Sequence, residues 1–367
     1  MLKFGIDSIG IKLPSYAIHA KDVASLQGIS DKKVTAGLGC HMMGLCLDQE
    51  TVVDLAVEAA KRALSRFDGA IEDIGLIAVG TETAIDEARP LSAWVAEALH
   101  LEGHIRSYEV KHACYAGTLA LKQAVEWKAT QPPSSKKVGL VIAADICTYA
   151  PGHPAEMTQG AGAIAFVVGK GKVASIDLRS YPYSAPCFDF WRPKGHDFPI
   201  VNAPESLNAY IIAVKKCYDE FFREQPYLTL TDFYALCFHT PFPKMVLRAF
   251  KQVGCQLRIP SEQQEEIVET RIRPFMDWNS EIGNSYTASL WINTVRALHT
   301  ASMGGKLACF SYGSGFGAEL LILERQEGKA DWAQDVHYDL EHRTLISLDD
   351  YRHWRMRCHH EHEKAKN

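Results

Sequence analysis

The chain has 367 residues, 47% of them hydrophobic and 23% charged, which is an ordinary globular composition and a length suited to two domains. The formal net charge of −5 provides no basic field, so we expect no nucleic-acid partner. No apolar run reaches the roughly 18 residues that span a bilayer, and residues 1–9 lack the features of a signal peptide. These observations predict a cytoplasmic protein that has no membrane partner.

The ten cysteines indicate neither a disulfide framework nor a metal centre. There is no Cys-x-x-Cys pair and no Cys/His set with zinc-finger spacing, so reduced thiols and no bound metal are expected. Near the end of the chain, His359, His360 and His362 could bind stray metal, but the favoured interpretation is a solvated, frayed helix.

The first 170 residues alternate strands with helices. Residues 74–80 and 138–145 are continuous apolar runs, which strands buried on both faces require. Thr51 is the expected N-cap of a helix, and residues 37–44, GLGCHMMG, are interpreted as a loop that could meet a ligand. Strands are predicted over residues 3–13, 74–80, 107–111, 138–145 and 160–169, with helices over 22–26, 51–64 and 91–99 and after residue 114. The alternation predicts an α/β domain with a largely parallel sheet.

The second half repeats this rhythm, apart from an aromatic, proline-containing excursion over residues 189–199. Strands are predicted over residues 173–181, 234–238, 306–311 and 317–324, with helices over 206–224, 261–269 and 289–301 and one opening near residue 242. The repetition predicts a duplicated α/β unit, with one half over residues 1–170 and the other over 171–367.

Cys114 lies at the turn between the strand ending at residue 111 and the following helix. Its neighbours are small, which allows another backbone or a ligand to approach closely: they are Ala113, Ala116 and Gly117. A cysteine at a helix start meets unpaired N–H groups and the positive end of the helix dipole, which both favour the thiolate. Most cysteines are inert core thiols, so Cys114 by itself does not indicate catalysis. The case for a nucleophile also depends on the polar residues predicted to lie near it.

Three further polar residues follow predicted strands or occupy small-residue turns: Glu82, His239 and Asn284. Singly, they could be a helix cap, a core histidine and a left-handed turn residue. Ligands of open α/β sheets bind beyond the carboxyl ends of the strands, so we expect these residues to meet Cys114 there. Such a set would provide a nucleophile, a proton carrier and a polarising amide, and the Gly313-Ser314-Gly315 backbone could stabilise an oxyanion.

These residues lie in seven motifs whose order along the chain is specific. The motifs are GTETAIDEA from Gly80, YEVKHACYAGT from Tyr108, TQGAGAIA from Thr158, DFWRPKGHDFP from Asp189, CFHTPFPKM from Cys237, GNSYTASL from Gly283 and FSYGSG from Phe310. Through them, the chain from about Gly5 to Glu324 resembles the 3-hydroxy-3-methylglutaryl-CoA (HMG-CoA) synthase family of the thiolase superfamily.

The resemblance implies an α/β thiolase fold, in which duplicated βαβαβαββ halves form a five-layered αβαβα sandwich, and it implies a homodimer. It also implies an acyltransferase of the mevalonate pathway that condenses acetyl-CoA, acetoacetyl-CoA and water to HMG-CoA and CoA. The CoA thioesters are substrates, and no cofactor is expected.

The resemblance also assigns roles to residues. Cys114 matches the nucleophile that carries the acetyl group, Glu82 the acid/base that deprotonates the acetyl methyl, and His239 the residue at the acetoacetyl-CoA carbonyl and thioester. The N–H groups of Cys114 and Ser314 match the oxyanion hole. The matches to substrate-binding residues are Asn284 and Ser314 as substrate contacts, Tyr149, Thr158 and Phe190 as the pocket wall, and Lys244 and Arg248 as contacts to CoA.

The chain departs from the family at two of these places. Arg248 stands where the bacterial proteins carry lysine, and the two residues hold phosphate differently. Phe316 follows Gly315 where small residues are common, which could alter CoA binding or the subunit contact.

Two alternatives remain open at this stage. The first is the relative that performs β-branching in polyketide assembly, whose acyl groups are attached to an acyl-carrier protein. The motifs DFWRP and TQGAGA and the lysine of PFPKM favour the mevalonate type instead. The second is a thiolase-fold binding protein without catalysis, which the presence of Glu82, Cys114 and His239 disfavours. Glu82 also separates methyl deprotonation from the decarboxylating ketoacyl synthases, which share the Cys/His/Asn set.

Overall fold

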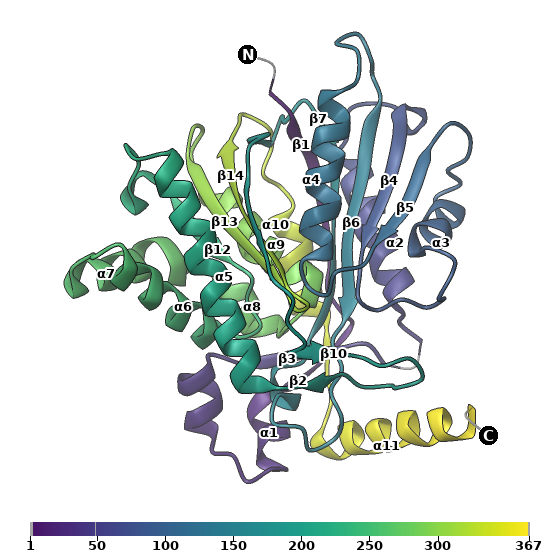
Figure 1. Ribbon diagram of the computed structural model, residues 1–367. Coiled ribbons are helices and arrows are strands. Elements are labelled where there is room, and N and C mark those ends of the chain that lie inside the picture. Colours follow the sequence, from purple (N-terminus) through teal and green to yellow (C-terminus); the bar gives the residue numbers. More distant parts are fainter. Residues whose placement is uncertain (1–2, 48, 366–367) are drawn as a thin grey trace.

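The computed structural model describes residues 3–47 and 49–365, with side chains described through residue 356, and contains two five-stranded sheets (Figure 1). The first sheet has the order β1-β7-β6-β4-β5, where β1 is Gly5–Lys12, β4 is Ile74–Gly80, β5 is Arg106–Val110, β6 is Val138–Ile146 and β7 is Ala161–Gly169. All five confirm predicted strands.

The prediction that this sheet is largely parallel fits four of its strands, which run in one direction, but not β7. β4 is parallel to β5 and β6, but β7 is antiparallel to both β1 and β6. A parallel neighbour needs a crossover, usually through a helix. Residues 147–160, between β6 and β7, contain only the 3₁₀ helix η3 (Glu156–Thr158), so the chain reverses directly.

The second sheet has the order β12-β13-β14-β8, with β9 also paired to β14. Its strands are β8 (Ala174–Ile176), β9 (Tyr181–Ser184), β12 (Ala235–Phe238), β13 (Lys306–Gly313) and β14 (Gly317–Arg325). The single strand predicted over residues 173–181 is therefore wrong, because β8 and β9 pair with opposite ends of β14. The Asp177 carboxylate accepts the Arg179 N–H at 2.9 Å and turns the chain between them.

Helices cover the outer faces of both sheets and fill the space between them. α2 (Val52–Ser65) and α3 (Leu91–Ala98) pack on the outer face of the first sheet, and α5 (Ala203–Glu224) and α6 (Pro243–Gln256) on that of the second. α4 (Ala116–Ala129) and α9 (Ser289–Thr300) bury their apolar side chains between the sheets, in a core to which both halves contribute. The layers therefore have the expected αβαβα order.

Local sequence signals account for several of these elements. Thr51 and Asp54 form a capping box at the start of α2, as its predicted N-cap requires. Residues 37–44, in contrast, are not the predicted ligand loop. They include the end of a π-helix, η1 (Lys33–Leu38), and most of β3 (Met42–Leu45), whose buried residues pair with β2 (Tyr16–His19).

After β14 the chain returns to the first half through α10 (Ala333–His342), β15 (Thr344–Leu345) and α11 (Leu348–Ala365). β15 pairs with β2, and α11 confirms the terminal helix, although the side chains of His359, His360 and His362 lie outside the described residues. The remaining elements are α1 (Ala20–Ser25), η2 (Ile71–Asp73), β10 (Phe190–Trp191), β11 (Ile200–Val201), η4 (Leu230–Asp232), α7 (Ser261–Ile267), η5 (Val268–Ile272), η6 (Arg273–Phe275), α8 (Asp277–Ile282) and η7 (Tyr286–Ala288).

Among the residues that the structure describes, no helix is both long enough and apolar enough to cross a membrane. The division of the chain between residues 170 and 171 stays a prediction.

Candidate active site

A cysteine and a glutamate meet where two parallel strands end. Glu82 follows β4, and Cys114 lies in the turn between β5 and α4. Because β4 and β5 are neighbours, their carboxyl ends bring the two side chains together, and the Cys114 thiol donates a hydrogen bond to Glu82 Oε1 at 3.0 Å. This contact is the one that the sequence predicted between these strand ends.

The turn that presents Cys114 is strained and tightly enclosed. Ala113 has φ of +42°, a conformation that residues other than glycine rarely adopt. At Gly313, an added Cβ would lie 2.5 Å from both the His112 carbonyl oxygen and the Tyr115 nitrogen, so the Gly313-Ser314-Gly315 backbone packs directly on this turn. The backbone segments of Cys114 and Ser314 are therefore neighbours.

Burial and nearby negative charge set the protonation of Glu82 and Cys114. Burial, with a smaller contribution from the Asp145 charge, raises the pKa of Glu82 to about 8. Burial and the Glu82 carboxylate raise the pKa of Cys114 well above that of a free thiol. The prediction that the helix start favours the thiolate is therefore wrong, because α4 begins at Ala116 and the effects of burial and of Glu82 dominate.

Asp145, near the end of β6, organises the Glu82 loop, and the sequence analysis assigned it no role. Its Oδ1 accepts hydrogen bonds from the Thr81 and Thr83 hydroxyls at 2.8 Å and from the Glu82 and Thr83 N–H groups at 2.8 and 2.9 Å. Its Oδ2 accepts the Thr287 N–H and hydroxyl, at 3.0 and 2.5 Å. A carboxylate that ends a buried apolar strand is the signal that could have identified it.

His239 follows β12 and is buried, as its place after a predicted strand indicated. Its N–H donates to the Phe310 carbonyl at 2.8 Å, and its carbonyl accepts the Tyr210 hydroxyl at 2.7 Å, which fixes the backbone. Burial lowers the pKa of the imidazole to about 3, so the ring is neutral. Its Nδ1 is buried and has no hydrogen-bond partner within the described structure.

Asn284 and Thr158 approach the site from opposite halves. The Asn284 N–H donates to the Thr158 carbonyl at 2.9 Å, and the Asn284 side-chain oxygen accepts the Tyr286 N–H at 3.0 Å. The Asn284 amide group therefore keeps its two N–H donors for other partners. Asn284 and Thr158 are both buried.

The structure brings most of the predicted residues to one cavity of about 490 Å³. Its lining includes Cys114, Tyr149, Thr158, Phe190, His239, Arg248, Asn284 and Ser314. Glu82 instead lines an adjoining cavity of about 310 Å³, which shares Phe190, Tyr286 and Ser314 with the first. Lys244 is exposed and does not line the main cavity, in contrast to Arg248 one helical turn later.

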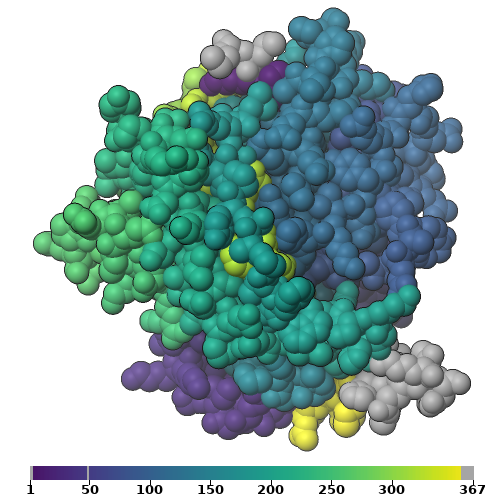
Figure 2. Space-filling view, viewed as in Figure 1, coloured from purple at the N-terminus to yellow at the C-terminus, as the bar shows by residue number. Residues whose placement is uncertain are grey.

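The aromatic excursion forms the front of the site. In the space-filling view, the teal surface around residues 185–205 lies across the seam between the blue first half and the green second half (Figure 2). The hairpin of β10 and β11 presents Phe190, whose ring meets that of Tyr286 edge to face at 6.0 Å between centroids. Arg192 donates to the Glu82 carbonyl at 2.7 Å and so ties the excursion to the Glu82 loop.

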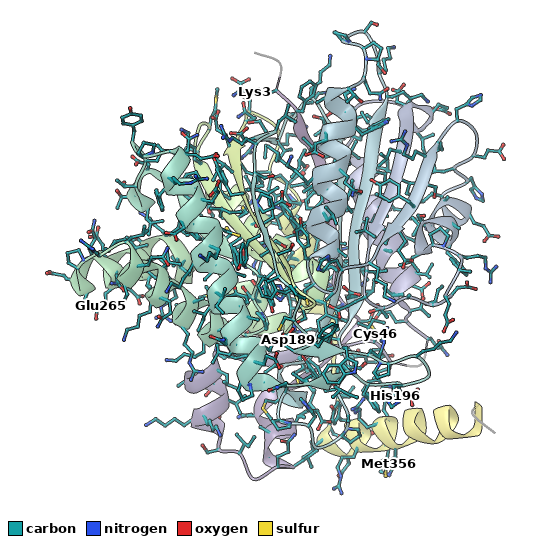
Figure 3. All side chains as sticks on the ribbon, in the orientation of Figure 1. Lys3, Cys46, Asp189, His196, Glu265 and Met356 are labelled. Carbon is teal, nitrogen blue, oxygen red and sulfur yellow. The ribbon has the colours of Figure 1, made fainter. Side chains whose placement is uncertain are left out.

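Asp189, labelled in Figure 3, lies at the start of this excursion. It is fully buried and holds Ser314. The Ser314 hydroxyl donates to Asp189 Oδ2 at 2.9 Å, and the Tyr312 hydroxyl lies 3.4 Å from the same oxygen. Phe316, the bulky residue noted in the sequence, is buried against Tyr183 and Tyr312, away from the main cavity lining. Asp189 belongs to one of the sequence motifs, but its contact with Ser314 joins positions 125 residues apart, which no local pattern indicates.

The thiols and acidic groups show no metal centre in the described part of the chain. The nine cysteines there are free, and no three His, Cys, Asp or Glu side chains group as metal ligands.

The layered fold and the Cys/Glu/His site together define a class of protein: an acyl-CoA condensing enzyme of the thiolase fold, which is an acyltransferase. Residues 2–172 match the family model "Hydroxymethylglutaryl-coenzyme A synthase N terminal", and residues 176–255 and 258–367 match its "C terminal" counterpart. The chain belongs to the hydroxymethylglutaryl-CoA synthase family.

Individual relatives agree with this assignment. The hydroxymethylglutaryl-CoA synthase of Enterococcus faecalis is 32% identical over 95% of this chain and 91% of its own. The structure of MvaS in complex with 3-hydroxy-3-methylglutaryl coenzyme A superposes with a TM-score of 0.89 at 30% identity, covering 96% and 92% of the two chains. The Curacin biosynthetic pathway HMG synthase in complex with holo donor-ACP gives 0.90 at 25% identity, covering 96% and 88%.

Proposed function

We propose that the protein condenses acetyl-CoA with acetoacetyl-CoA and water, giving HMG-CoA and free CoA, as a step of the mevalonate pathway. The observation that carries the proposal is the 3.0 Å contact between Cys114 and Glu82, beside the cavity that His239 and Asn284 line. A nucleophile and a base in direct contact suit a reaction that first forms a thioester and then deprotonates its methyl group.

In the first step, Cys114 takes the acetyl group from acetyl-CoA and releases CoA. The N–H groups of Cys114 and Ser314 are the proposed donors to the oxyanion, and the packing of the Gly313 backbone on the Cys114 turn supports this role. Glu82, the hydrogen-bond acceptor of Cys114, takes the thiol proton and passes it to the departing CoA thiolate, so that it is again a base.

In the second step, Glu82 removes a proton from the acetyl methyl, the resulting carbanion attacks the ketone carbon of acetoacetyl-CoA, and the ketone oxygen takes up the proton as it becomes a hydroxyl. A carboxyl with a pKa of about 8 accepts and returns protons near neutrality. His239, which is neutral and lines the main cavity, is the proposed hydrogen-bond partner of the ketone and thioester oxygens. Water then hydrolyses the Cys114 thioester and frees HMG-CoA.

The other predicted residues bind and position the substrates. We assign the pocket wall to Tyr149, Thr158 and Phe190, and the acyl contacts to Asn284 and Ser314, since all five line the main cavity. Arg248 lines the same cavity and is the better placed cation for CoA. Lys244, exposed one turn earlier on α6, would meet only a part of CoA outside the cavity.

The test is covalent labelling with a single substrate. Acetyl-CoA alone should add one acetyl group to the peptide that holds Cys114, and Cys114→Ala should abolish the adduct. Cys255→Ser, which removes an exposed thiol, is the matched control and should acetylate normally. An acetyl group on another cysteine would contradict the proposal.

A second candidate is the same condensation with acyl groups on acyl-carrier proteins. The fit to the Curacin pathway enzyme, which was solved with holo donor-ACP, is the observation that favours it. The identity is higher to the Enterococcus faecalis relative, so free CoA thioesters are the first choice. Turnover with carrier-bound acyl groups, but none with free CoA thioesters, would decide for this candidate.

The enzyme should act as a homodimer. β5 is an edge of the first sheet and bears the Glu109 and Val110 segment that leads to Cys114. An open strand edge offers unpaired N–H and C=O groups to a second copy. Sedimentation should therefore give twice the mass of the chain, which is 40.8 kDa.

A further inference from the structure

The last helix of the chain contacts the loop that carries the acyl-pocket wall. α11 lies along the lower edge of the molecule, below the hairpin that contains β10 (Figure 1). From this helix, the Arg355 guanidinium donates to the Tyr149 carbonyl, and the Tyr351 hydroxyl donates to Glu156 Oε1 at 2.9 Å. Tyr149 and Glu156 both belong to the segment between β6 and β7.

Both main-chain polar groups of Tyr149 depend on this arrangement. Arg355 holds its carbonyl, while its N–H donates to the side-chain oxygen of Gln159. The Gln159 amide nitrogen in turn donates to the Tyr351 hydroxyl at 3.3 Å. Arg355 therefore restrains the Tyr149 carbonyl directly, and Tyr351 restrains the Tyr149 N–H through Gln159.

The contacts are buried and charged, which distinguishes them from ordinary surface contacts. The side chains of Arg355 and Glu156 are only 6% and 4% exposed, with Nε and Oε1 3.6 Å apart. Glu156 Oε2 also accepts the Gly152 N–H at 2.7 Å, which bends the same loop. Buried charges are stable only when they are paired and hydrogen-bonded, so the loop and the helix constrain one another.

The other face of Tyr149 lies toward the nucleophile. Tyr149, Cys147 and Tyr286 form a small apolar cluster against which Cys114 packs. Tyr149 and Cys114 also line the same cavity. A displacement of the Tyr149 backbone would therefore change the space beside the Cys114 sulfur, where an acyl group must fit.

We propose that Tyr351 and Arg355 are positioning residues that set the size of the acyl group accepted at Cys114. The inference rests on the proposed function, in which Cys114 carries an acyl thioester. Neither residue lines the cavity, so both act through Tyr149. α11 thereby determines which acyl groups are accepted, although the catalytic side chains lie on other elements.

The test compares acylation of Cys114 by acetyl-CoA and by propionyl-CoA, measured by mass spectrometry as second-order rates. Tyr351→Phe removes only the hydroxyl, and Arg355→Lys keeps the charge but loses the planar fork. Each variant should lower the preference for acetyl-CoA at least about threefold, because a less restrained wall admits the extra methylene, which is worth about 10- to 200-fold in a well-formed pocket. A ratio of rates is independent of the fraction of folded enzyme.

Arg352→Ala is the matched control, since Arg352 lies on the exposed side of the same helix, and it should keep the wild-type preference. Preferences unchanged in Tyr351→Phe, with only the melting temperature lowered, would overturn the proposal and leave α11 as a purely stabilising helix. Tyr351→Phe keeps its ring in the buried cluster, so the result does not depend on whether Arg355→Lys folds. A wild-type protein that forms no acyl-Cys114 would refute the proposed function, and the positioning role with it.

Discussion

The Glu82 carboxylate opposes the ionisation of Cys114, because its charge raises the pKa of the thiol, whereas the hydrogen bond from the thiol lowers the pKa of Glu82. The Cys114 thiol donates to the Glu82 carboxyl at 3.0 Å, and a pKa of about 8 leaves a fraction of that carboxyl ionised near neutrality. Once Cys114 carries the acyl group, its sulfur has no proton to donate and cannot ionise. Glu82 is then free to act as a base beside the new thioester. The order of the two proposed chemical steps follows from this coupling.

Replacing Glu82 separates the two steps. Glu82→Ala removes the proton acceptor of Cys114, but it also removes the charge that raises the thiol pKa, so acetylation of Cys114 should remain detectable. Condensation should fall by about 10²–10⁴, the usual cost of a lost general base, and exchange of the acetyl methyl protons with deuterated water should vanish. Mass spectrometry and proton NMR measure the two steps. Loss of acetylation as complete as in Cys114→Ala would show that Glu82 is needed to form the thiolate.

The methyl-proton exchange should also depend on pH. The pKa of Glu82 is raised from 4.5 to about 8, so below pH 8 the carboxyl is mostly protonated and cannot act as a base. Exchange on the acetylated enzyme should therefore increase with pH through about 8. Asp145→Asn removes a charge that raises this pKa and should shift the profile to lower pH. A profile that is flat between pH 6 and 9 would contradict the role of Glu82.

At the scale of elements, the close approach of β4 to α4 brings Glu82 to Cys114. A Cβ built on Gly80 would lie 2.4 Å from the Gly117 nitrogen and Cα, so the last residue of β4 touches the first turn of α4. Only glycine fits at this contact. A larger residue on either side would move the end of the strand away from the turn that holds Cys114.

Gly80→Ala should therefore lower the unfolding free energy by about 1–3 kcal/mol, the usual cost of overpacking a core. The control is Gly139→Ala in β6, where the added Cβ would lie 3.5 Å from its nearest neighbours, an ordinary contact. Thermal unfolding of both variants measures the difference. Equal melting temperatures for Gly80→Ala and Gly139→Ala would mean that β4 and α4 can separate without cost.

Element by element, the sequence predicts what local patterns encode. Buried runs such as residues 74–80 and 138–145 are strands, and the polar residues that follow them meet at the site. Strand direction was mispredicted at β7, because direction depends on how the chain returns and apolar runs carry no such information. The contacts of Asp189 with Ser314 and of Arg355 with Tyr149 join distant segments, and periodicity does not report such pairs.

At the scale of the whole molecule, ion pairs and a backbone hydrogen bond join α10 to the first half of the chain. Arg62 on α2 binds Asp339 through two hydrogen bonds of 2.8 and 3.0 Å, and Arg66, just after α2, binds Asp335 in the same way at 2.8 and 2.7 Å. Asp339 also accepts the Leu13 N–H at 2.8 Å. These pairs place α10, and through it α11, against the first half.

Removing one partner of a buried pair leaves the other charge uncompensated. Arg62→Met should lower the unfolding free energy by about 3–5 kcal/mol, because the Asp339 side chain is 2% exposed. Lys172→Met, whose partner Asp68 is exposed, should cost at most about 1 kcal/mol. Urea unfolding compares the two variants. If Arg62→Met were no less stable than Lys172→Met, the contact between α2 and α10 would not hold the chain end in place.

The six hydrogen bonds to Asp145 also have a consequence for how the molecule could be divided. Four come from the loop after β4, and two come from Thr287, which lies beyond β12 in the other half. A chain cut between residues 170 and 171 would give one fragment with the nucleophile and the base and another with His239 and the Thr287 donors. Neither fragment alone could supply all six hydrogen bonds to the Asp145 carboxylate. Recovery of acetoacetyl-CoA turnover on mixing the fragments would therefore report directly that they have assembled.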